Sequence, residues 1–385
     1  MEYLQKMRQE IDHLDAELAQ IFLRRLDLTA RIGTHKQKSG LPALDQRREL
    51  QIIQNTAQLT GEEEQKLAVA KLFETVLALS RREQQIKAAG GVPGRGYLRC
   101  RQAMEQARQP VENPRVVYQG TPGAYSEMAC LNFFGRDCNC CGLKSFDAVF
   151  EAVSNGEADY GVVPIENSST GGIRQVYELL GEYEHLIVGE TTVKVEHCLM
   201  APEGATLDTI THVYSHEQGL FQSDRFLKQY PGWVQVPYGD TAGCGKYVAE
   251  SGDVTKAAIC SSRAAELYGL HILVQGVNHN ENNTTRFVVV SPKMELREGA
   301  NKISAILTLP HEVGSLNEVL TLFAVHDLNM VKLESRPMPG HSWEYLFFVE
   351  FSGNLTHPEV DAAMQELSHV CAHLRIMGNF KSSLE

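Results

Sequence analysis

Residues 281–290 read ENNTTRFVVV, a polar run that passes into a phenylalanine and three valines without a glycine or proline. A surface loop usually places a turn residue before its strand, and valine-rich segments are typical of buried strands. We therefore expect this segment at the mouth of a core strand. Upstream, apolar runs such as RVVYQG (115–120) and DYGVVPI (159–165) alternate with helical patterns. The alternation predicts an α/β domain over residues 114–294, with a largely parallel sheet and two lobes around a cleft.

Residues 1–87 contain no strand-like alternation and are predicted to form an all-α helical domain. A first helix is indicated by apolar residues in steps of three and four, at Leu4, Met7, Ile11, Leu14, Leu18, Ile21, Leu28 and Ile32. Such a helix is roughly 50 Å long at ~1.5 Å per residue. The rest of residues 1–87 is too short to cover it, so we expect the chain to dimerise through this helix. A second helix should begin near Asp45, and a third should open with a capping box at Thr60 and Glu63 and run to about Lys87.

Two further segments complete the expected organisation. Residues 88–113 are interrupted by Gly and Pro, which predicts a linker with about two helical turns at its end. Residues 300–385 read strand, helix, strand, strand, helix, strand, the β-α-β-β-α-β order of an α+β ferredoxin-like domain. The protein is therefore expected to be multidomain.

Composition narrows the classes of function. With 43% apolar and 22% charged residues, the chain is typical of soluble globular proteins, and acids near its N-terminus argue against a signal peptide, so we expect a cytoplasmic protein. A net charge of -12 without a basic stripe disfavours nucleic-acid binding. The nine cysteines suit reduced thiols, and the C-x-x-C at Cys138–Cys141 lacks a second ligand pair, so we expect neither a metal nor a cofactor.

Polar residues interrupt the apolar faces of all three expected helices. Arg25 occupies the next position of the first helix's apolar seam, where a guanidinium is costly unless an anion pairs with it. One interpretation is a structural ion pair of Arg25 with Asp45 or Glu49. The other is a site for a small polyanion, formed by Arg8, Arg25, Lys36, Asp45, Arg48, Glu49, Ser80 and Gln84.

This set of eight residues resembles the active-site pattern of the all-helical chorismate mutase family. A pericyclic rearrangement needs no nucleophile, only a substrate held in its reactive conformer and donors that bind the transition state best. The resemblance implies that Arg8, Arg25 and Arg48 hold two carboxylates. It implies that Lys36 and Gln84 meet the charge on the ether oxygen, and that Glu49 and Asp45 contact the hydroxyl and neighbouring cations. It also implies that Arg8 reaches into a partner chain's site.

Three motifs mark the α/β domain. GTPGAYSEMA (120–129) is a Gly-rich turn from strand to helix, and VVPIENSSTGGI (162–173) leads from a strand to a helix with backbone amides that could bind a carboxylate. Simple helix capping is the alternative for the second motif. With Thr285-Arg286-Phe287 and VYSH (213–216), these motifs resemble prephenate dehydratase.

The resemblance to prephenate dehydratase implies specific roles. Thr285 would be the proton donor that assists departure of a ring hydroxyl as water. Arg286 would hold a carboxylate, and Phe287 would pack against the ring of the substrate. Further substrate-binding candidates by motif position are Tyr125, Ser126, Asn167, Ser168, Thr170 and His216.

The last domain resembles the ACT regulatory fold in its phenylalanine-sensing form. HEVGSL (311–316) opens its first helix and ESRP (334–337) closes its second strand. In that form, amides at a helix end hold the amino acid's carboxylate at a domain interface, whereas any ferredoxin-like unit would also have a loop there. The implied effector-binding residues are Gly314, Ser315, Leu316, Glu334, Ser335 and Arg336.

The three resemblances together imply a bifunctional enzyme of phenylalanine biosynthesis. It would convert chorismate to prephenate and prephenate to phenylpyruvate, as a homodimer or higher homo-oligomer inhibited by L-phenylalanine, without a membrane or nucleic-acid partner. Two alternatives remain at this point. The second step could prefer arogenate, the amino form of the substrate, or the bilobed domain could sense an aromatic ligand without turnover.

Overall fold

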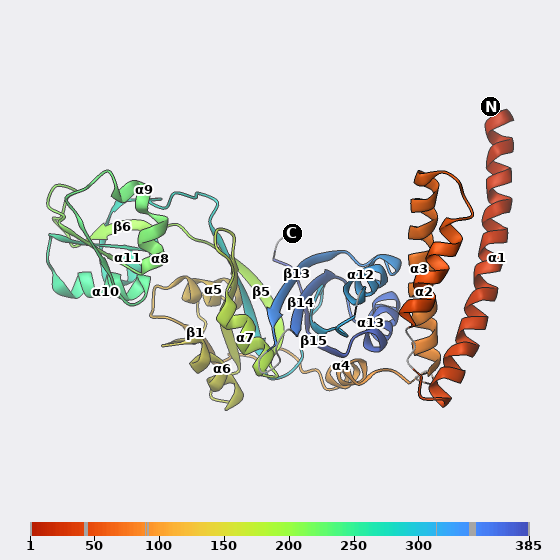
Figure 1. The fold of residues 1–385 in the computed structure, drawn as a ribbon. Helices are drawn as coiled ribbons and strands as arrows, with labels where there is room; N and C mark the ends of the chain where they lie inside the picture. Colours follow the sequence, from red (N-terminus) through yellow and green to blue (C-terminus); the bar gives the residue numbers. More distant parts are fainter. Residues whose placement is uncertain are drawn as a thin grey trace. The chain divides into compact units, whose positions relative to one another are not determined.

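The computed structural model describes residues 2–41, 45–88, 90, 92–312, 314–338 and 344–383 (Figure 1). Two compact units make up the chain, and each is continuous in space but not in sequence. The first contains Met1–Arg101, Ile306–Phe351 and Leu355–Arg375, and the second contains Gln102–Ala305, Ser352–Asn354 and Ile376–Glu385.

The N-terminal part of the first unit is helical, as predicted. It consists of α1 (Glu2–Lys38), α2 (Gln46–Ala57) and α3 (Glu63–Ala88), and both α1 and α2 pack on α3 (Figure 1). Asp45 caps α2 by accepting a hydrogen bond from the Arg48 amide at 3.0 Å. The predicted capping box is wrong. Thr60 accepts from the Glu62 amide at 3.3 Å and not from that of Glu63, and α3 begins only at Glu63.

The apolar seam of α1 lacks a cover within a single chain. Leu14, Leu18 and Ile21 are 57%, 54% and 62% exposed, respectively. Exposed apolar rows of this length are unusual on a monomeric soluble protein and mark interaction surfaces.

The segment that follows α3 contains more structure than predicted. In place of two helical turns at its end, it forms the 11-residue helix α4 (Arg95–Glu105) in its middle. Hydrogen bonds tie it to the later helix α13, from the Gly94 amide to Ser368 Oγ at 3.0 Å and from Tyr97 Oη to both Asp361 oxygens at 3.0 Å. The segment is therefore a packed element, at least within its unit.

The C-terminal part follows the predicted β-α-β-β-α-β order. Its four strands form one sheet in the order β13-β14-β12-β15, and Phe323 and Phe351 meet edge to face in the core between helix and sheet, with ring centroids 4.9 Å apart. The elements are β12 (Lys302–Thr308), α12 (Ser315–Val325), β13 (Met330–Pro337), β14 (Tyr345–Ser352), α13 (Pro358–Val370) and β15 (His373–Phe380).

The first lobe of the second unit contains a six-stranded sheet of order β2-β1-β3-β11-β5, with β4 paired to β3. β1 runs parallel to β2 and β3, whereas β11 lies antiparallel between β3 and β5. The elements are β1 (Val116–Gln119), α5 (Tyr125–Phe134), β2 (Cys140–Leu143), α6 (Phe146–Ser154), β3 (Tyr160–Asn167), β4 (Gly171–Gly172), α7 (Arg174–Glu182), β5 (Leu186–Lys194) and β11 (Thr284–Ser291).

The second lobe contains a five-stranded sheet of order β10-β6-β9-β7-β8, also with both parallel and antiparallel pairs. Two lobes are therefore present as predicted, but the prediction of a largely parallel sheet is wrong. The elements are β6 (Cys198–Ala201), β7 (His212–Ser215), α8 (Glu217–Gln222), α9 (Asp224–Leu227), β8 (Val234–Pro237), α10 (Thr241–Ser251), β9 (Lys256–Cys260), α11 (Ser262–Tyr268) and β10 (His271–Val274).

Candidate active sites

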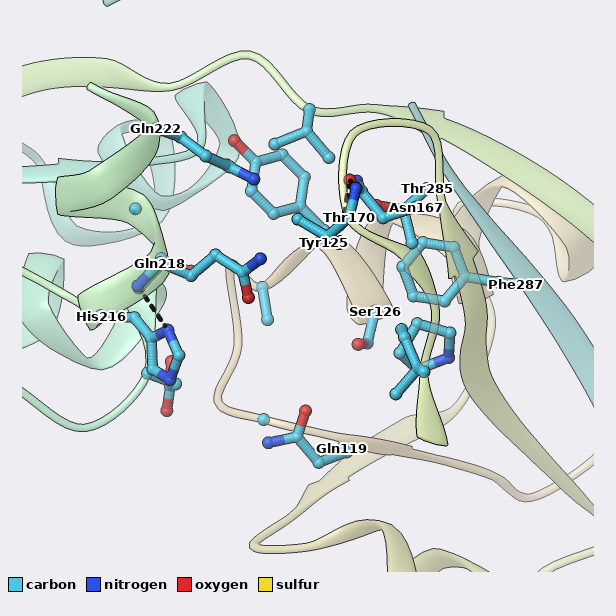
Figure 2. Close-up of a pocket in the computed structure, with 18 of the residues that line it drawn as sticks. Gln119, Tyr125, Ser126, Asn167, Thr170, His216, Gln218, Gln222, Thr285 and Phe287 are labelled. Atoms are coloured by element: carbon cyan, nitrogen blue, oxygen red, sulfur yellow. Dashed lines mark hydrogen bonds between the residues drawn. The ribbon is translucent and has the colours of Figure 1, made fainter. Parts of the chain in front are cut away.

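A cavity of about 400 Å³ opens between the two lobes of the second unit (Figure 2). Volumes of this order are ordinary for small-molecule sites. None of the described residues that line it is Lys or Arg, so any anion bound there must be met by hydroxyl, amide, imidazole or backbone donors. Its polar lining residues are Gln119, Tyr125, Ser126, Asn167, Thr170, His197, His216, Gln218, Gln222, Asp240, Thr241 and Thr285.

Strand β11 supplies the residues of the T-R-F triplet in alternation. Thr285 and Phe287 line the cavity, whereas Arg286 does not. This follows from strand geometry, since successive side chains point to opposite faces. In Figure 2, Thr285, Asn167 and Phe287 lie on the side of the cavity opposite His216 and Gln218.

The amide of Asn167 has only one orientation that satisfies its neighbours. Its Oδ1 accepts hydrogen bonds from the backbone amides of Ser169 and Thr170 at 2.9 and 3.2 Å. Nδ2 therefore faces the other way and donates to Thr285 Oγ1 at 2.9 Å and to Asn283 Oδ1 at 2.8 Å. Because Thr285 accepts this bond and no described residue accepts its proton, the hydroxyl proton is available to a molecule in the cavity.

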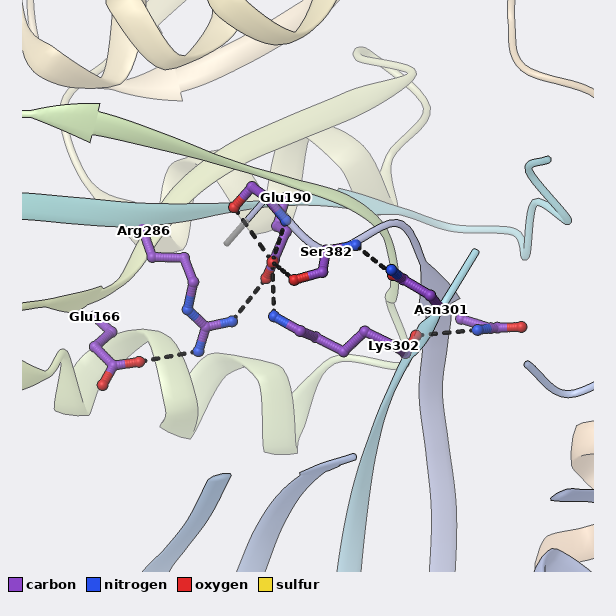
Figure 3. Close-up of polar contacts among 8 residues, drawn as sticks. Glu166, Glu190, Arg286, Asn301, Lys302 and Ser382 are labelled. Atoms are coloured by element: carbon purple, nitrogen blue, oxygen red, sulfur yellow. Dashed lines mark hydrogen bonds and ion pairs between the residues drawn. The ribbon is translucent and has the colours of Figure 1, made fainter. Parts of the chain in front are cut away.

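Arg286 belongs to a buried charge cluster on the far side of β11 (Figure 3). Its guanidinium donates to Glu190 at 2.8 Å and to Glu166 at 3.0 Å. Glu190 also accepts from Lys302 Nζ at 2.7 Å and from the Ser383 amide at 2.8 Å. The predicted role of Arg286 in holding a substrate carboxylate is therefore not supported, because two protein carboxylates already occupy its guanidinium.

The charge state of this cluster is set by competing effects. Burial alone raises the pKa of the Glu190 carboxyl, but Arg286, Lys302 and the Ser383 amide outweigh burial and hold that pKa below its usual range. Glu190 is therefore an anion that neutralises two buried cations.

Most other predicted residues of this domain meet at the cavity. Tyr125, Ser126, Thr170 and His216 all line it. Ser168 does not, because its hydroxyl accepts from the Thr284 amide at 2.9 Å and lies 3.3 Å from Asn282 O. Ser168 therefore joins two loops and does not contact the cavity.

Sequence reasoning missed three buried polar residues near Thr285. His197, Gln222 and Asn283 are 3%, 9% and 1% exposed, and the first two line the cavity. None belongs to the recognised motifs, although the polarity of Asn283 at a strand mouth was a signal. Burial lowers the pKa of His197, and its hydrogen bond to Gln222 offsets part of that shift.

The helical domain brings part of the predicted mutase set together. Arg25 Nη1 donates to Ser80 Oγ, and a Cβ added to Gly33 would lie 2.9 Å from the side chain of Gln84, so α1 and α3 are in close contact there. Burial lowers the pKa of Arg25, and the Glu49 carboxylate offsets part of that shift. Ser80 and Gln84 are both buried.

The alternative of a structural ion pair for Arg25 is not supported. Among the described residues, Glu49 pairs with Arg81 instead, and Asp45 caps α2. Arg8 and Arg48 are exposed and Lys36 is half-buried. Within the described part of the chain, the half-buried Arg25 has Ser80 and the Val76 carbonyl, at 3.5 Å, as hydrogen-bond partners.

The residues predicted to bind an effector lie at two places in the C-terminal part. Gly314 precedes α12 with a φ of 92°, a value that favours glycine, followed by Ser315 and Leu316. Glu334, Ser335 and Arg336 lie on β13, where Arg336 pairs with Glu334 at 2.9 Å.

Two further properties concern the described part of the chain. Within it, no group of three or more His, Cys, Asp or Glu side chains is arranged to hold a metal ion. No helix that the structure describes combines the length and the apolar character needed to cross a membrane.

Comparison with protein families matches both catalytic regions. A model described as chorismate mutase type II matches residues 7–85. A model described as prephenate dehydratase matches residues 116–295.

Comparison with individual proteins gives matches of two kinds. A bifunctional chorismate mutase/prephenate dehydratase of Escherichia coli K12 is 31% identical over 98% of this chain and 95% of its own. An Arabidopsis thaliana protein named arogenate dehydratase/prephenate dehydratase 6 is 34% identical over 70% of this chain and 69% of its own. The prephenate dehydratase from Arthrobacter aurescens, whose crystal structure was solved in complex with L-Phe, has 28% sequence identity to this chain. The two structures align with a TM-score of 0.64 over 70% of this chain and 90% of that one.

Proposed function

Because the chain belongs to the family of bifunctional chorismate mutase/prephenate dehydratases, we propose that it converts chorismate to prephenate and then prephenate to phenylpyruvate. The helical domain carries the first step and the bilobed domain the second. L-phenylalanine inhibits the enzyme through the C-terminal part, which we assign as an ACT domain over residues 300–385. We expect the protein to work in the cytoplasm.

One observation carries the dehydratase assignment, namely that Thr285 presents a proton to the cavity. Thr285 Oγ1 accepts from Asn167 Nδ2, and its proton, which no described residue accepts, is free to be donated to a molecule in the cavity. Thr285 donates to the ring hydroxyl of prephenate, whose C–O bond breaks to release water. The electrons of the breaking C–C bond to the ring carboxylate enter the ring, carbon dioxide leaves, and the ring becomes aromatic. Positioned proton donors of this kind contribute about 10² to 10⁴ in rate.

The substrate's carboxylates meet neutral donors in this cavity. Helix α5 begins there at Tyr125, and its N-cap, Ala124, supplies no side-chain hydrogen bond. Free amides at a helix N-terminus are suited to bind an anion. We assign one carboxylate to this helix end beside Ser126, in place of the contact with Arg286 expected from the sequence. A carboxylate without a cation also remains free to leave as carbon dioxide.

The mutase site is assigned to the groups around Arg25. The guanidinium of Arg25 on α1 donates to Ser80 of α3, and Gln84 lies one turn further along α3, so the two helices together supply a pair of donors. Such donors stabilise charge that develops on the ether oxygen in the transition state. Two copies of the chain complete the site, because the exposed seam of α1 would be buried in a dimer and Arg8 would reach the partner's site.

The experiment compares rates on chorismate, prephenate and arogenate, each with and without L-phenylalanine, for wild-type, Thr285→Ala and Thr285→Ser chains. Thr285→Ala should lower the dehydratase kcat by about 10² to 10⁴, whereas Thr285→Ser retains a hydroxyl and most of the rate. The thermal midpoint of each variant is the control for folding of the bilobed domain, and the mutase rate is the control for the helical domain. A Thr285→Ala chain with near wild-type dehydration would refute the assignment of the proton donor.

The same assay separates the two alternatives. A higher kcat/KM on arogenate than on prephenate would favour the amino substrate, since the two differ only in the side chain's amino or keto group. Ligand binding without turnover of either compound would favour a sensor.

A further inference from the structure

The chain crosses between the two lobes of the second unit twice, and polar groups gather at these crossings. Residues 195–197 lead from β5 to β6, and residues 275–283 lead from β10 back to β11. The crossings are hydrogen-bonded to each other, from the Val195 amide to Asn283 O at 2.8 Å and from the His197 amide to Asn278 Oδ1 at 2.9 Å. His197 and Asn283 therefore lie where the lobes are joined.

A continuous hydrogen-bond network connects this junction to Thr285. Asn283 Nδ2 donates to Gln222 Oε1 at 3.3 Å, and His197 Nε2 lies 3.0 Å from the same oxygen. Asn283 Oδ1 accepts from Asn167 at 2.8 Å, and Asn167 in turn donates to Thr285. Gln222 belongs to α8 of the second lobe, whereas Asn167 and Thr285 belong to β3 and β11 of the first.

The direction of every bond in the network follows from one fixed end. The backbone amides of Ser169 and Thr170 fix the oxygen of Asn167, so its nitrogen faces Asn283 Oδ1. The nitrogen of Asn283 must then face Gln222, whose oxygen is the acceptor. His197 Nε2 can only be a donor to that oxygen, so the neutral ring carries its proton on Nε2.

The other ring nitrogen of His197 is therefore an acceptor. Tyr125 Oη lies 3.0 Å from Nδ1 and 2.9 Å from Glu196 O, and shares its proton between them. His197 thus holds Tyr125, at the start of α5, and Gln222, at the end of α8, in fixed relation. Both residues line the cavity.

We propose that His197 is a positioning residue of the dehydratase site, which fixes Gln222 and, through Asn283 and Asn167, the hydroxyl of Thr285 across the lobe junction. This inference rests on the proposed dehydratase function. His197 has no contact with the reacting atoms and transfers no proton, because Gln222 Oε1 accepts from both of its neighbours and the network cannot carry a proton through it. Its effect is on geometry, where a displacement of about 1 Å costs on the order of 10²-fold in rate.

Two substitutions at His197 test the hydrogen bonds of its two ring nitrogens separately. In His197→Gln the side-chain nitrogen can reach the place of Nε2 and still donate to Gln222. In His197→Asn the amide reaches only the place of Nδ1, so the bond to Gln222 is lost. A matched control is His185→Gln, since His185 is 4% exposed and bonded to Ser154 at 2.9 Å but does not line the cavity.

The experiment measures dehydratase kcat and KM, mutase rate and thermal midpoint for these three variants in the full chain. His197→Asn should lose about 10- to 100-fold in dehydratase kcat, His197→Gln should recover most of that loss, and His185→Gln should keep its kcat whatever its midpoint. In a chain that already carries Thr285→Ala, His197→Asn should cause a smaller fold-loss than in the wild-type chain, because part of its effect acts through Thr285.

Three outcomes would overturn the inference: wild-type kcat in His197→Asn, an equal loss in His197→Gln and His197→Asn, or an additive loss in the Thr285→Ala chain. An inactive wild-type chain on prephenate and arogenate would instead refute the proposed function itself. The thermal midpoint distinguishes each of these results from misfolding of the bilobed domain, since the mutase rate reports only on the helical domain.

Discussion

The buried charge cluster gives the sharpest prediction for stability. We expect Glu190→Gln to destabilise the second unit strongly although the two side chains have almost the same shape. The side chain of Glu190 is fully buried, and Arg286 and Lys302 are each only 6% exposed. After the substitution, Lys302 loses its counter-ion and Arg286 loses its pair with Glu190, while its pair with the partly exposed Glu166 remains.

The magnitude follows from the loss of one partner in a buried ion pair. Removal of one member leaves a buried charge uncompensated and costs about 3 to 5 kcal/mol. With a urea m-value of about 2 kcal/mol/M, the midpoint for the second unit should fall by ~1.5 to 2.5 M. The double variant Glu190→Gln with Lys302→Met should recover part of this loss, because it also removes the Lys302 charge that paired with Glu190.

The assay follows both activities of one chain through a urea titration. Loss of dehydratase activity should shift in Glu190→Gln, while loss of mutase activity should not, because the helical domain lies in the other unit. The matched control is Glu196→Gln, whose carboxylate pairs with Lys194 at 3.7 Å and is 51% exposed, so its cost should stay below about 1 kcal/mol. A Glu190→Gln shift no larger than that of Glu196→Gln would refute the reasoning.

Three further predictions follow from the sites described above. Folding holds the pKa of Glu190 below its unfolded value of about 4.3. The stabilisation that Glu190 provides is therefore fully present above that pH and is lost as the pH falls through the lower pKa of the folded state. The urea midpoint measured at decreasing pH should show this loss in the wild-type chain and not in Glu190→Gln. Arg25→Ala should lower the mutase rate by about 10² to 10³ and leave dehydration intact; an unchanged mutase rate would mean that Arg25 is structural. Leu18→Asp should yield monomers without mutase activity by light scattering and rate assay, whereas Gln20→Asp, on the opposite side of α1, should stay dimeric; a dimeric Leu18→Asp chain would exclude this seam.

The helices were the most predictable part of the fold because their signals are local. The seam of α1 is readable from periodicity, and its end at Lys38 lies just before Gly40, a common helix stop. The sheets were less predictable, because β11 follows the whole second lobe in sequence and yet lies between β3 and β5. No local pattern reports such a return, so the antiparallel pairs were missed.

Glycines gave the wrong indication in the segment before the bilobed domain. They suggested flexibility, but a Cβ at Gly94 would lie 2.3 Å from the Ser368 carbonyl oxygen, and one at Gly96 would lie 2.2 Å from that of Leu374. These glycines permit close packing of α4 and its lead-in. Sequence alone does not distinguish a glycine required for close approach from one that loosens a chain.

The candidate sites were predictable where motifs carry them and unpredictable where only three-dimensional contact does. Thr285, Asn167 and Tyr125 could be named from short motifs, whereas His197 and Gln222 become partners only when the two lobes are assembled. Ser168 shows the converse, because its place in a motif suggested substrate contact while its hydroxyl joins two loops.

The position of Arg286 away from the cavity follows from a pattern that the sequence did contain. Once Thr285 is placed in a strand with its side chain toward the cavity, period-two geometry directs Arg286 to the opposite face and returns Phe287 to the cavity. A cation at that position points away from the residues of β11 that line the cavity. It can instead anchor the strand, and its bonds to Glu190 and Glu166 do so from β5 and β3, the two neighbours of β11. The triplet therefore combines catalysis and stability in consecutive residues. The position of the Thr285 hydroxyl depends on strand β11, which Arg286 anchors on the face opposite the cavity. Glu190→Gln should therefore slow dehydration even at urea concentrations too low to unfold the unit.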